Sequence, residues 1–265
     1  MGALPSKAAN RISAAIKKFR PILEAAKARD VNESDTVVIV TDLLQELFGY
    51  DKYAEITSEH AIRGTYCDLA IKLGEKLVLL IEVKAIGTEL KDQHVKQAID
   101  YAANKPCDWV VLTNGRHWRV YKVLFAKPID KNLVVDLCLM DLNPRADSDV
   151  SLAGLLAKES WPKESLGEFL EQKEALSRYT IAAVLQTDPV LAVIKRELRR
   201  VSPNAKIEAG DVAGVLRNEV LKRDVLEGEQ ADAAQKRVSR AAKKALRETK
   251  EDEDSSAVAP AEVKS

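Results

Sequence analysis

The sequence predicts an α/β domain with a central sheet, followed by a small all-helical region. Runs rich in β-branched and aromatic residues recur between residues 53 and 140, and one stretch of helical periodicity interrupts them. From residue 164 onward the periodicity is helical. Up to about residue 145 the elements therefore follow the order α-β-β-β-α-β-β-β. A domain of this length buries a core without disulfide or metal support.

The composition is typical of a globular protein without a membrane span. Hydrophobic residues make up 46% and charged residues 31% of the 265 residues, and no apolar run approaches the roughly 20 residues of a membrane helix. The basic N-terminus lacks the apolar stretch of a secretory signal. Lys and Arg number 41, as do Asp and Glu, so the net charge indicates no class of partner.

The three cysteines, Cys67, Cys107 and Cys138, are far apart and lie among apolar residues. This spacing fits neither a disulfide framework nor a zinc site. We expect free buried thiols in a reducing compartment, and hence a cytoplasmic protein.

Two helices are predicted before the first strand. Residues 5–29 form a basic amphipathic pattern that Pro21 is expected to interrupt or kink. In the next segment, the run Val37–Val40 favours a strand, but the apolar spacing up to Phe48 is helical. Because Gly49 can end a helix, we expect a helix there.

Six strands are predicted, at residues 53–57, 66–73, 77–84, 108–113, 117–124 and 133–140. A polar helix at about 89–104 separates the third strand from the fourth. The pair Asn114-Gly115 is a strong turn signal and predicts that the fourth and fifth strands form a hairpin.

The expected organisation is a basic helix (1–30), an α/β domain (31–145), a linker (146–163), a helical accessory domain (164–225) and a charged, largely disordered tail (229–265). In the tail, cations from Lys236 to Lys250 recur at spacings of three and four, so much of their charge would share one helix face. Such a face could neutralise phosphates, although the acidic residues 251–254 follow it and a solvated surface helix explains it equally.

The hairpin formed by the second and third strands brings charges together. With a three-residue turn (74–76), one side of the hairpin is wholly apolar, and Asp68 lies opposite Glu82 on the other side. Lys84 follows two residues further along the same side. A two-residue turn would shift the register by one residue and place these charges among the leucines. The apolar pattern therefore selects the register that groups the charges.

Two opposed carboxylates repel, and a divalent cation would remove the repulsion. Mg²⁺ is usually held by one or two carboxylates together with waters and phosphate oxygens. A lysine beside it could orient a water or neutralise developing charge, which suits phosphodiester hydrolysis. The alternative is an ordinary solvated hairpin face. Against this stands the apolar run Leu77–Ile81, which is typical of a central strand covered on both sides.

Asp68, then Glu82-Val83-Lys84, then a Gln97-x-x-x-Tyr101 helix element resemble the PD-(D/E)xK nuclease pattern of the N-terminal nuclease domain of type I restriction enzyme R subunits. The flanking segments also resemble this family, so that the resemblance covers about residues 30–140. One difference is that Tyr66-Cys67-Asp68 lacks the proline of the nominal motif.

The resemblance implies a restriction-endonuclease-like fold, with a mixed central sheet flanked by helices. It implies that Asp68 and Glu82 are metal ligands for Mg²⁺, which Mn²⁺ can replace, and that Lys84 is the catalytic lysine. Gln97 and Tyr101 would support the site from their helix. The family often adds an acidic residue from the entry helix, for which Glu46 is the first candidate and Glu59 the second.

The expected function is Mg²⁺-dependent endonucleolytic cleavage of DNA, of restriction or defence type. No P-loop motif is found, so this chain is expected to use no ATP and to act as a stand-alone relative of the nuclease domain. The alternative is a catalytically silent DNA-binding or assembly module that keeps the fold. Cleavage of RNA, a homodimer and association with other subunits of a restriction system all stay open.

Overall fold

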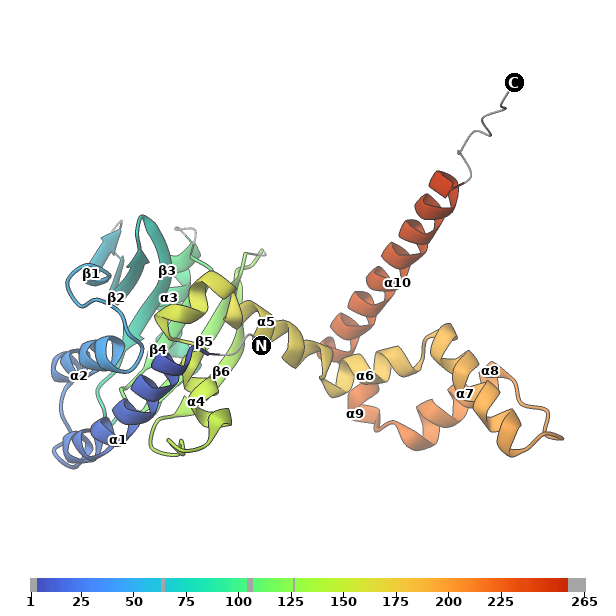
Figure 1. Ribbon diagram of the computed structural model, residues 1–265, viewed down its shortest axis with the longest axis horizontal. Coiled ribbons are helices and arrows are strands. Elements are labelled where there is room, and N and C mark those ends of the chain that lie inside the picture. The colour runs from blue at the N-terminus through green and yellow to red at the C-terminus, as the bar shows by residue number, and fades with distance from the viewer. Residues whose placement is uncertain (1–3, 63–64, 104–106, 126, 257–265) are drawn as a thin grey trace, which may run out of the picture. The chain divides into compact units, whose positions relative to one another are not determined.

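The computed structural model describes residues 4–62, 65–103, 107–125 and 127–256 of the chain. The chain divides into two compact units, Met1–Leu170 and Glu171–Ser265, whose elements are labelled in Figure 1. Within the described ranges, no helix is both long enough and apolar enough to cross a membrane.

Unit 1 is built on a mixed sheet, which has six strands in the described part of the chain. The strands are β1 (Ile56–Ile62), β2 (Thr65–Leu73), β3 (Lys76–Val83), β4 (Trp109–Thr113), β5 (His117–Leu124) and β6 (Asp130–Cys138). They lie side by side in chain order, and all neighbours are antiparallel except β3 and β4, which are parallel. A parallel pair needs a crossover connection, and α3 (Asp92–Ala103) supplies it.

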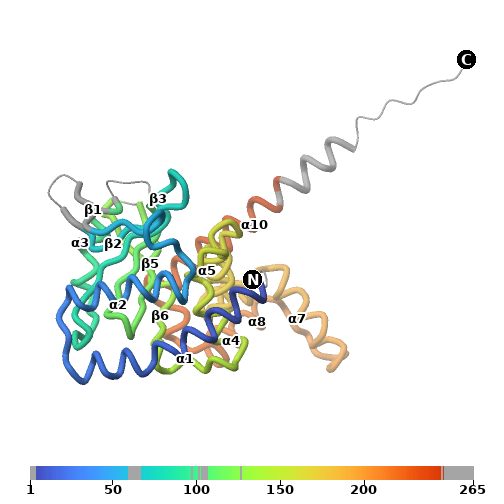
Figure 2. The backbone as a smooth tube through the Cα atoms, turned by 60° about the vertical axis from the view of Figure 1, so that its left-hand side comes forward, coloured from blue at the N-terminus to red at the C-terminus, as the bar shows by residue number. Residues whose placement is uncertain are grey.

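Helices cover both faces of the sheet (Figures 1 and 2). On one face, α1 (Ser6–Ala28) and α2 (Glu33–Glu46) pack in one apolar core with Leu79 and Ile81 of β3. On the other face, α3 packs in a second core with Leu80. Alternate residues of β3 are thus buried under different helices, as expected for a central strand. The predicted fold class, a mixed sheet flanked by helices, is confirmed.

Helix α1 is part of the core of unit 1. Ile12, Ile16, Phe19 and Leu23 are almost completely buried. The expected interruption at Pro21 is absent, because the helix runs unbroken from Ser6 to Ala28. Pro21 lies on the exposed side of α1, where water can bond the carbonyl that the missing N–H leaves without an intrahelical partner.

The hairpin of β2 and β3 has the predicted register but a different turn. Leu69 pairs with Ile81, as a three-residue turn would require. The turn itself has only two residues, Gly74 and Glu75. A β-bulge at Val78 of β3 compensates for the shorter turn and restores the register.

Unit 1 extends past residue 145, where the sequence predicted the end of the α/β domain. The expected linker 146–163 instead contains α4 (Asp147–Gly154) and the 3₁₀ helix η1 (Lys158–Lys163), and α5 (Ser165–Ala175) follows. Leu155 and Leu156 are buried in the core that also contains α1. The polar residues of this segment form helix ends and turns, and the apolar residues between them complete the core.

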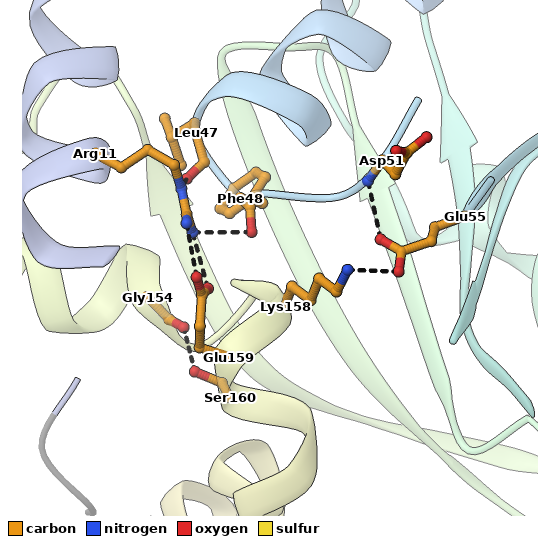
Figure 3. A network of polar contacts seen from close by, with 9 residues as sticks. All are labelled: Arg11, Leu47, Phe48, Asp51, Glu55, Gly154, Lys158, Glu159 and Ser160. Atoms are coloured by element: carbon orange, nitrogen blue, oxygen red, sulfur yellow. Dashed lines mark hydrogen bonds and ion pairs between the residues drawn. The ribbon is translucent and has the colours of Figure 1, made fainter. Parts of the chain in front are cut away.

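A polar network fixes this segment against the rest of unit 1 (Figure 3). The guanidinium of Arg11 donates to both carboxylate oxygens of Glu159, at 2.7 and 2.8 Å, and to two backbone carbonyls just beyond the end of α2. The hydrogen bond from Arg11 lowers the pKa of Glu159. Lys158 pairs with Glu55 at 2.5 Å. The segment after the sheet is thereby held to α1 and to the chain entering β1.

The regular elements of unit 2 are all helices in its described part, and turns and loops join them. Its elements are α6 (Arg178–Leu185), α7 (Asp188–Val201), α8 (Ala209–Val215), a π-helical turn (Leu216–Val220), α9 (Arg223–Leu226) and α10 (Glu229–Ser256). A helix therefore occupies most of the segment expected to be disordered. Ala, Lys, Arg and Glu are strong helix formers, and Ala231 and Ala234 are buried where α10 packs against α6.

Candidate active site

The two carboxylates predicted to bind a metal come from adjacent strands. Asp68 lies in β2, and Glu82 lies near the end of β3. Lys84 directly follows β3, and its backbone N–H donates to the carbonyl of Thr113 in β4 at 2.8 Å. This bond continues the parallel pairing past the strand end, so Lys84 stays in line with Glu82 on one sheet face. We call Asp68, Glu82 and Lys84 the charged cluster.

Asp68 bonds to the backbone of β3. Its Oδ2 accepts the N–H of Val83 at 2.7 Å. The backbone ladder between β2 and β3 reaches Leu69 and Ile81, so the next pair in the same register is Asp68 and Glu82. At this point the N–H of Val83 donates to a side-chain carboxylate rather than to a backbone carbonyl. Asp68 is therefore a structural acceptor as well as a candidate metal ligand.

Glu82 is the most deeply buried member of the charged cluster, with 5% of its surface exposed. Its Oε1 lies 2.8 Å from Nζ of Lys84. Burial raises the pKa of Glu82 and the charge of Asp68 adds to this effect, which together outweigh the hydrogen bond from Lys84. The environment of Glu82 therefore favours the protonated form of the carboxyl group more than water does.

Lys84 remains protonated in this environment. Burial lowers the pKa of the ammonium, but the hydrogen bond and charge of Glu82, with the charges of Glu33 and Asp68, outweigh burial and raise it. The ammonium thus neutralises part of the negative charge of the cluster.

The negative field of the charged cluster reaches Cys67. Burial, followed by the charges of Glu82 and Asp68, raises the pKa of the Cys67 thiol to about 12. The thiol is therefore protonated and is not a candidate nucleophile. All three cysteines are free, as predicted. Cys67 and Cys107 are buried, whereas Cys138 is only partly buried, so the expected burial is wrong for Cys138.

Helix α2 brings a further carboxylate to the charged cluster, and it is that of Glu33. Its Oε2 lies 3.4 Å from Nζ of Lys84. Glu46, the residue expected from the sequence, lies thirteen positions further along α2, about 20 Å away at 1.5 Å per residue. There it forms an ion pair with Lys18 of α1. Glu46 is therefore not beside the charged cluster, and Glu33 is the carboxylate that α2 brings there.

Local contacts explain why the first turn of α2 meets the end of β3. Asn32 caps the helix by accepting a backbone N–H of the first turn at 2.9 Å. Thr36, which is completely buried, accepts the N–H of Ile86 through its hydroxyl at 3.1 Å. The segment after Lys84 is therefore bonded directly to the helix that carries Glu33.

The two residues expected to support the site from a helix lie one turn apart in α3, at Gln97 and Tyr101. The side chains of both, and that of Glu59 in β1, lie outside the described residues. Leu80 packs in the core beneath α3, so its alternate neighbours Glu82 and Lys84 lie on the same face of the sheet. The fold therefore places α3 on the side of the charged cluster.

The donor set suits a hard cation with an incomplete protein shell. Asp68 and Glu82 offer carboxylate oxygens from adjacent strands. A divalent cation would relieve the repulsion between them, which adds to the effect of burial in raising the pKa of Glu82. Within the described ranges, no group of three or more His, Cys, Asp and Glu side chains is spaced to hold a metal. These residues fit Mg²⁺ that completes its coordination with waters and phosphate oxygens, not a closed protein cage.

The fold and the charged cluster define an α/β domain with an acidic pair and a lysine at the end of its central strand. Residues 39–132 match the family described as type I restriction enzyme R protein N terminus. The matched segment includes Asp68, Glu82 and Lys84, and the resemblance predicted from the sequence is confirmed. Searches of curated proteins and of solved structures gave no match. Glu33, α1 and unit 2 lie outside the matched segment.

Proposed function

We propose that this protein is a Mg²⁺-dependent endonuclease that hydrolyses DNA phosphodiester bonds in a cytoplasmic restriction or defence system, without using ATP itself. The observation that carries the proposal is the grouping of Asp68, Glu82 and Lys84 at one end of the central strand, with Lys84 2.8 Å from Glu82. The match of residues 39–132 to a restriction-enzyme family supports the nuclease class.

In this proposal Asp68 and Glu82 hold the metal, and Mn²⁺ can replace Mg²⁺. The bound metal would supply positive charge that polarises the phosphate and acidifies a water. Lys84 is placed to stabilise the negative charge that develops on the phosphoryl oxygens, and Glu33 helps to hold its ammonium in position. In the reaction, the water gives up a proton to solvent as its oxygen bonds to phosphorus, the ester bond to the leaving oxygen breaks, and that oxygen takes up a proton from solvent.

The test is incubation of the full chain with supercoiled plasmid and with linear DNA, in Mg²⁺, in Mn²⁺ and in EDTA. We expect cleavage with either metal and none in EDTA. Glu82→Gln and Lys84→Gln should each lower the single-turnover rate by about 100-fold or more. Lys76→Gln is the matched control, because Lys76 is exposed at the opposite end of the same strand. Absence of metal-dependent cleavage, or Glu82→Gln and Lys84→Gln variants that cut like the parent, would refute the proposal.

One observation favours the alternative of a catalytically silent DNA-binding module. Within the described residues, the carboxylates do not form a three-residue metal group, and Lys84 already neutralises part of their charge. That alternative predicts DNA binding without cleavage in either metal, and equal binding by the parent and Glu82→Gln. An RNA duplex and a single-stranded RNA in the same assay distinguish an RNA substrate.

A further inference from the structure

The sheet face that carries the charged cluster continues over β4 and β5. Glu82 pairs with Leu112, and Leu112 pairs with Arg119, so these three residues form one row across the sheet. Paired residues project to the same face, and strands lie about 4.8 Å apart, so Arg119 lies about 10 Å from Glu82 on that face. The next row begins at Lys84 and leads to Asn114 and His117.

A cleft of about 350 Å³ lies at the far end of these two rows, where Asn114, His117 and Arg119 line it. It is lined by the loop 86–90 that follows Lys84, by Asn114 and the residues after it, and by Lys27 of α1. Asn114 holds the two sides together, because its amide donates to the carbonyl of Thr88 at 2.9 Å. The cleft is therefore built from the same segments that position Lys84.

The lining of the cleft is positively charged. Its lining contains Lys27, Arg116 and Arg119 and one carboxylate, that of Glu89, which is 85% exposed, while Asp136 beside the cleft is paired with Arg119. Burial and the charge of Arg116 lower the pKa of His117, so that this ring is neutral at pH 7 and adds no charge. A groove with an excess of cations attracts anions.

The cations of the cleft differ in what they already bond. Arg119 donates to the carbonyl of Leu90 at 2.8 Å and to Asp136 at 3.2 Å, so it shapes the wall. Lys27 lies 3.4 Å from the carbonyl of Gly87. Nε of Arg116 is buried and has no hydrogen-bond partner among the described residues. Arg116 forms no ion pair among the described residues, and since its Nε is shielded from solvent, an anion in the cleft would meet the terminal nitrogens of its guanidinium.

We propose that this cleft is a phosphate subsite that binds a phosphodiester of the DNA strand beside the scissile phosphate. Arg116 is its principal ligand and Lys27 its second cation. The planar guanidinium of an arginine matches the oxygens of a phosphate in a way that a lysine does not. The subsite rests on the proposed function, because it takes DNA as the ligand.

The experiment measures binding of a fluorescent DNA duplex to the full chain by anisotropy, in EDTA so that no metal-dependent cleavage occurs, over a range of salt concentrations. Arg116→Gln should weaken binding roughly tenfold. It should also reduce the slope of log affinity against log salt by about 0.9, the value for one phosphate contact. Lys27→Gln should reduce the slope similarly, and Arg116→Lys should keep the slope while losing part of the affinity.

Arg145→Gln is the matched control. It removes the same charge from an exposed loop, whose Pro144 carbonyl accepts a hydrogen bond from Ser13. Ser13 lies fourteen residues before Lys27 in α1, which is about 21 Å along the helix. We expect the parental affinity and slope for this variant. The thermal midpoint of each variant shows whether it is folded. If Arg116→Gln does not fold, Arg116→Lys and Lys27→Gln test the subsite in its place.

Parental affinity and slope in Arg116→Gln and Lys27→Gln would overturn the subsite, whereas metal-dependent cleavage by the parent would leave the proposed function intact. A reduced slope in both variants, with no cleavage by the parent, would support the subsite and refute the nuclease. A third outcome is that Arg116→Gln binds DNA like the parent, while inorganic phosphate raises the thermal midpoint of the parent and not that of the variant. The cleft would then bind a free anion, and the proposal would be overturned.

Discussion

Glu82 lies in an environment that favours the protonated form of its carboxyl group. Its pKa is raised in the folded chain, first by burial, so the protonated form favours folding. Its contribution to stability is present at low pH and is lost as the pH rises through the raised pKa. We therefore expect Glu82→Gln to have a higher thermal midpoint than the parent at neutral pH, with the difference vanishing toward about pH 4. Thermal melts of the parent and of Glu82→Gln across this pH range test the expectation, with Glu89→Gln as an exposed control. A difference in thermal midpoint that stays constant with pH would contradict it.

Asp68 should show its structural role when it is replaced in two ways. Asp68→Ala leaves the buried N–H of Val83 without its acceptor, which costs about 1–3 kcal/mol. Asp68→Asn keeps an oxygen at the same position and should lose much less stability. Both variants should lose metal-dependent cleavage, because the carboxylate ligand is gone. Urea unfolding measures the stabilities, and an Asp68→Ala protein as stable as the parent would contradict the structural role.

At the scale of single residues, the sequence predicted the charges that share one hairpin. Asp68, Glu82 and Lys84 are brought together by strand periodicity alone, and periodicity is visible in a sequence. Glu33 was missed because its proximity to Lys84 depends on which end of α2 meets β3. The hydrogen bond between Thr36 and the chain after β3 determines which end of α2 lies there, and no local sequence pattern predicts this bond.

At the scale of elements, the β2–β3 hairpin shows what an apolar pattern can and cannot predict. The pattern selected the register, because any other register would bury the charges. It did not predict the turn length, because a bulge at Val78 allows a two-residue turn to give the same register. Similarly, the polar composition of residues 146–163 concealed α4, since the buried leucines of that segment are few.

The two-residue turn makes a prediction about Gly74. Its φ of +61° lies in the left-handed region, where a side chain is strained. Gly74→Ala should therefore destabilise unit 1 by about 1 kcal/mol. Gly167→Ala is the control, because Gly167 lies in α5 with open space around it, and there alanine should be neutral or stabilising. Urea unfolding measures the free energy of unfolding of both variants and the parent. Equal changes in stability for Gly74→Ala and Gly167→Ala would contradict the assigned turn.

Arg237 is expected to hold α10 in unit 2. Its guanidinium donates to the carboxylate and the backbone carbonyl of Glu174 and to the hydroxyl of Thr180. Because the side chain is 39% exposed, we expect Arg237→Ala to lower the stability of unit 2 by only about 1–2 kcal/mol. Arg240→Ala, three residues on and exposed, should change it little. Circular dichroism during urea unfolding tests this. If Arg237→Ala were as stable as the parent, the contacts of Arg237 would contribute nothing to stability.

At the scale of the whole molecule, the matched family segment is smaller than the structural unit that contains it. Residues 39–132 include β1 to β5 and α3 but only the first three residues of β6, and they exclude α1, whose Phe19 and Leu23 are buried in the core. They also exclude Leu155 and Leu156, which are buried in that core too. The segments outside the match therefore complete the layer of the sheet opposite the charged cluster, and they extend unit 1 to Leu170.

The helix that replaces the expected disordered tail presents its cations as a stripe. Lys236, Arg240, Lys243 and Arg247 are exposed and recur at spacings of four, three and four residues, which places them on one face of α10. The buried Ala231 and Ala234 lie on the other side of the helix. The packing of α10 thus leaves this basic face to the solvent.

If this face binds DNA phosphates, replacing Arg240 and Lys243 together with glutamine should weaken duplex binding. The slope of log affinity against log salt should fall by up to about 1.8, which is 0.9 for each contact. The single-turnover cleavage rate at saturating DNA and low salt should be unchanged, because the charged cluster is intact. A double Lys7→Gln and Arg145→Gln variant removes the same charge from exposed positions of unit 1 and should bind like the parent. Equal affinity and equal slope in the α10 variant would show that its basic face is only solvated, and that DNA contacts lie elsewhere.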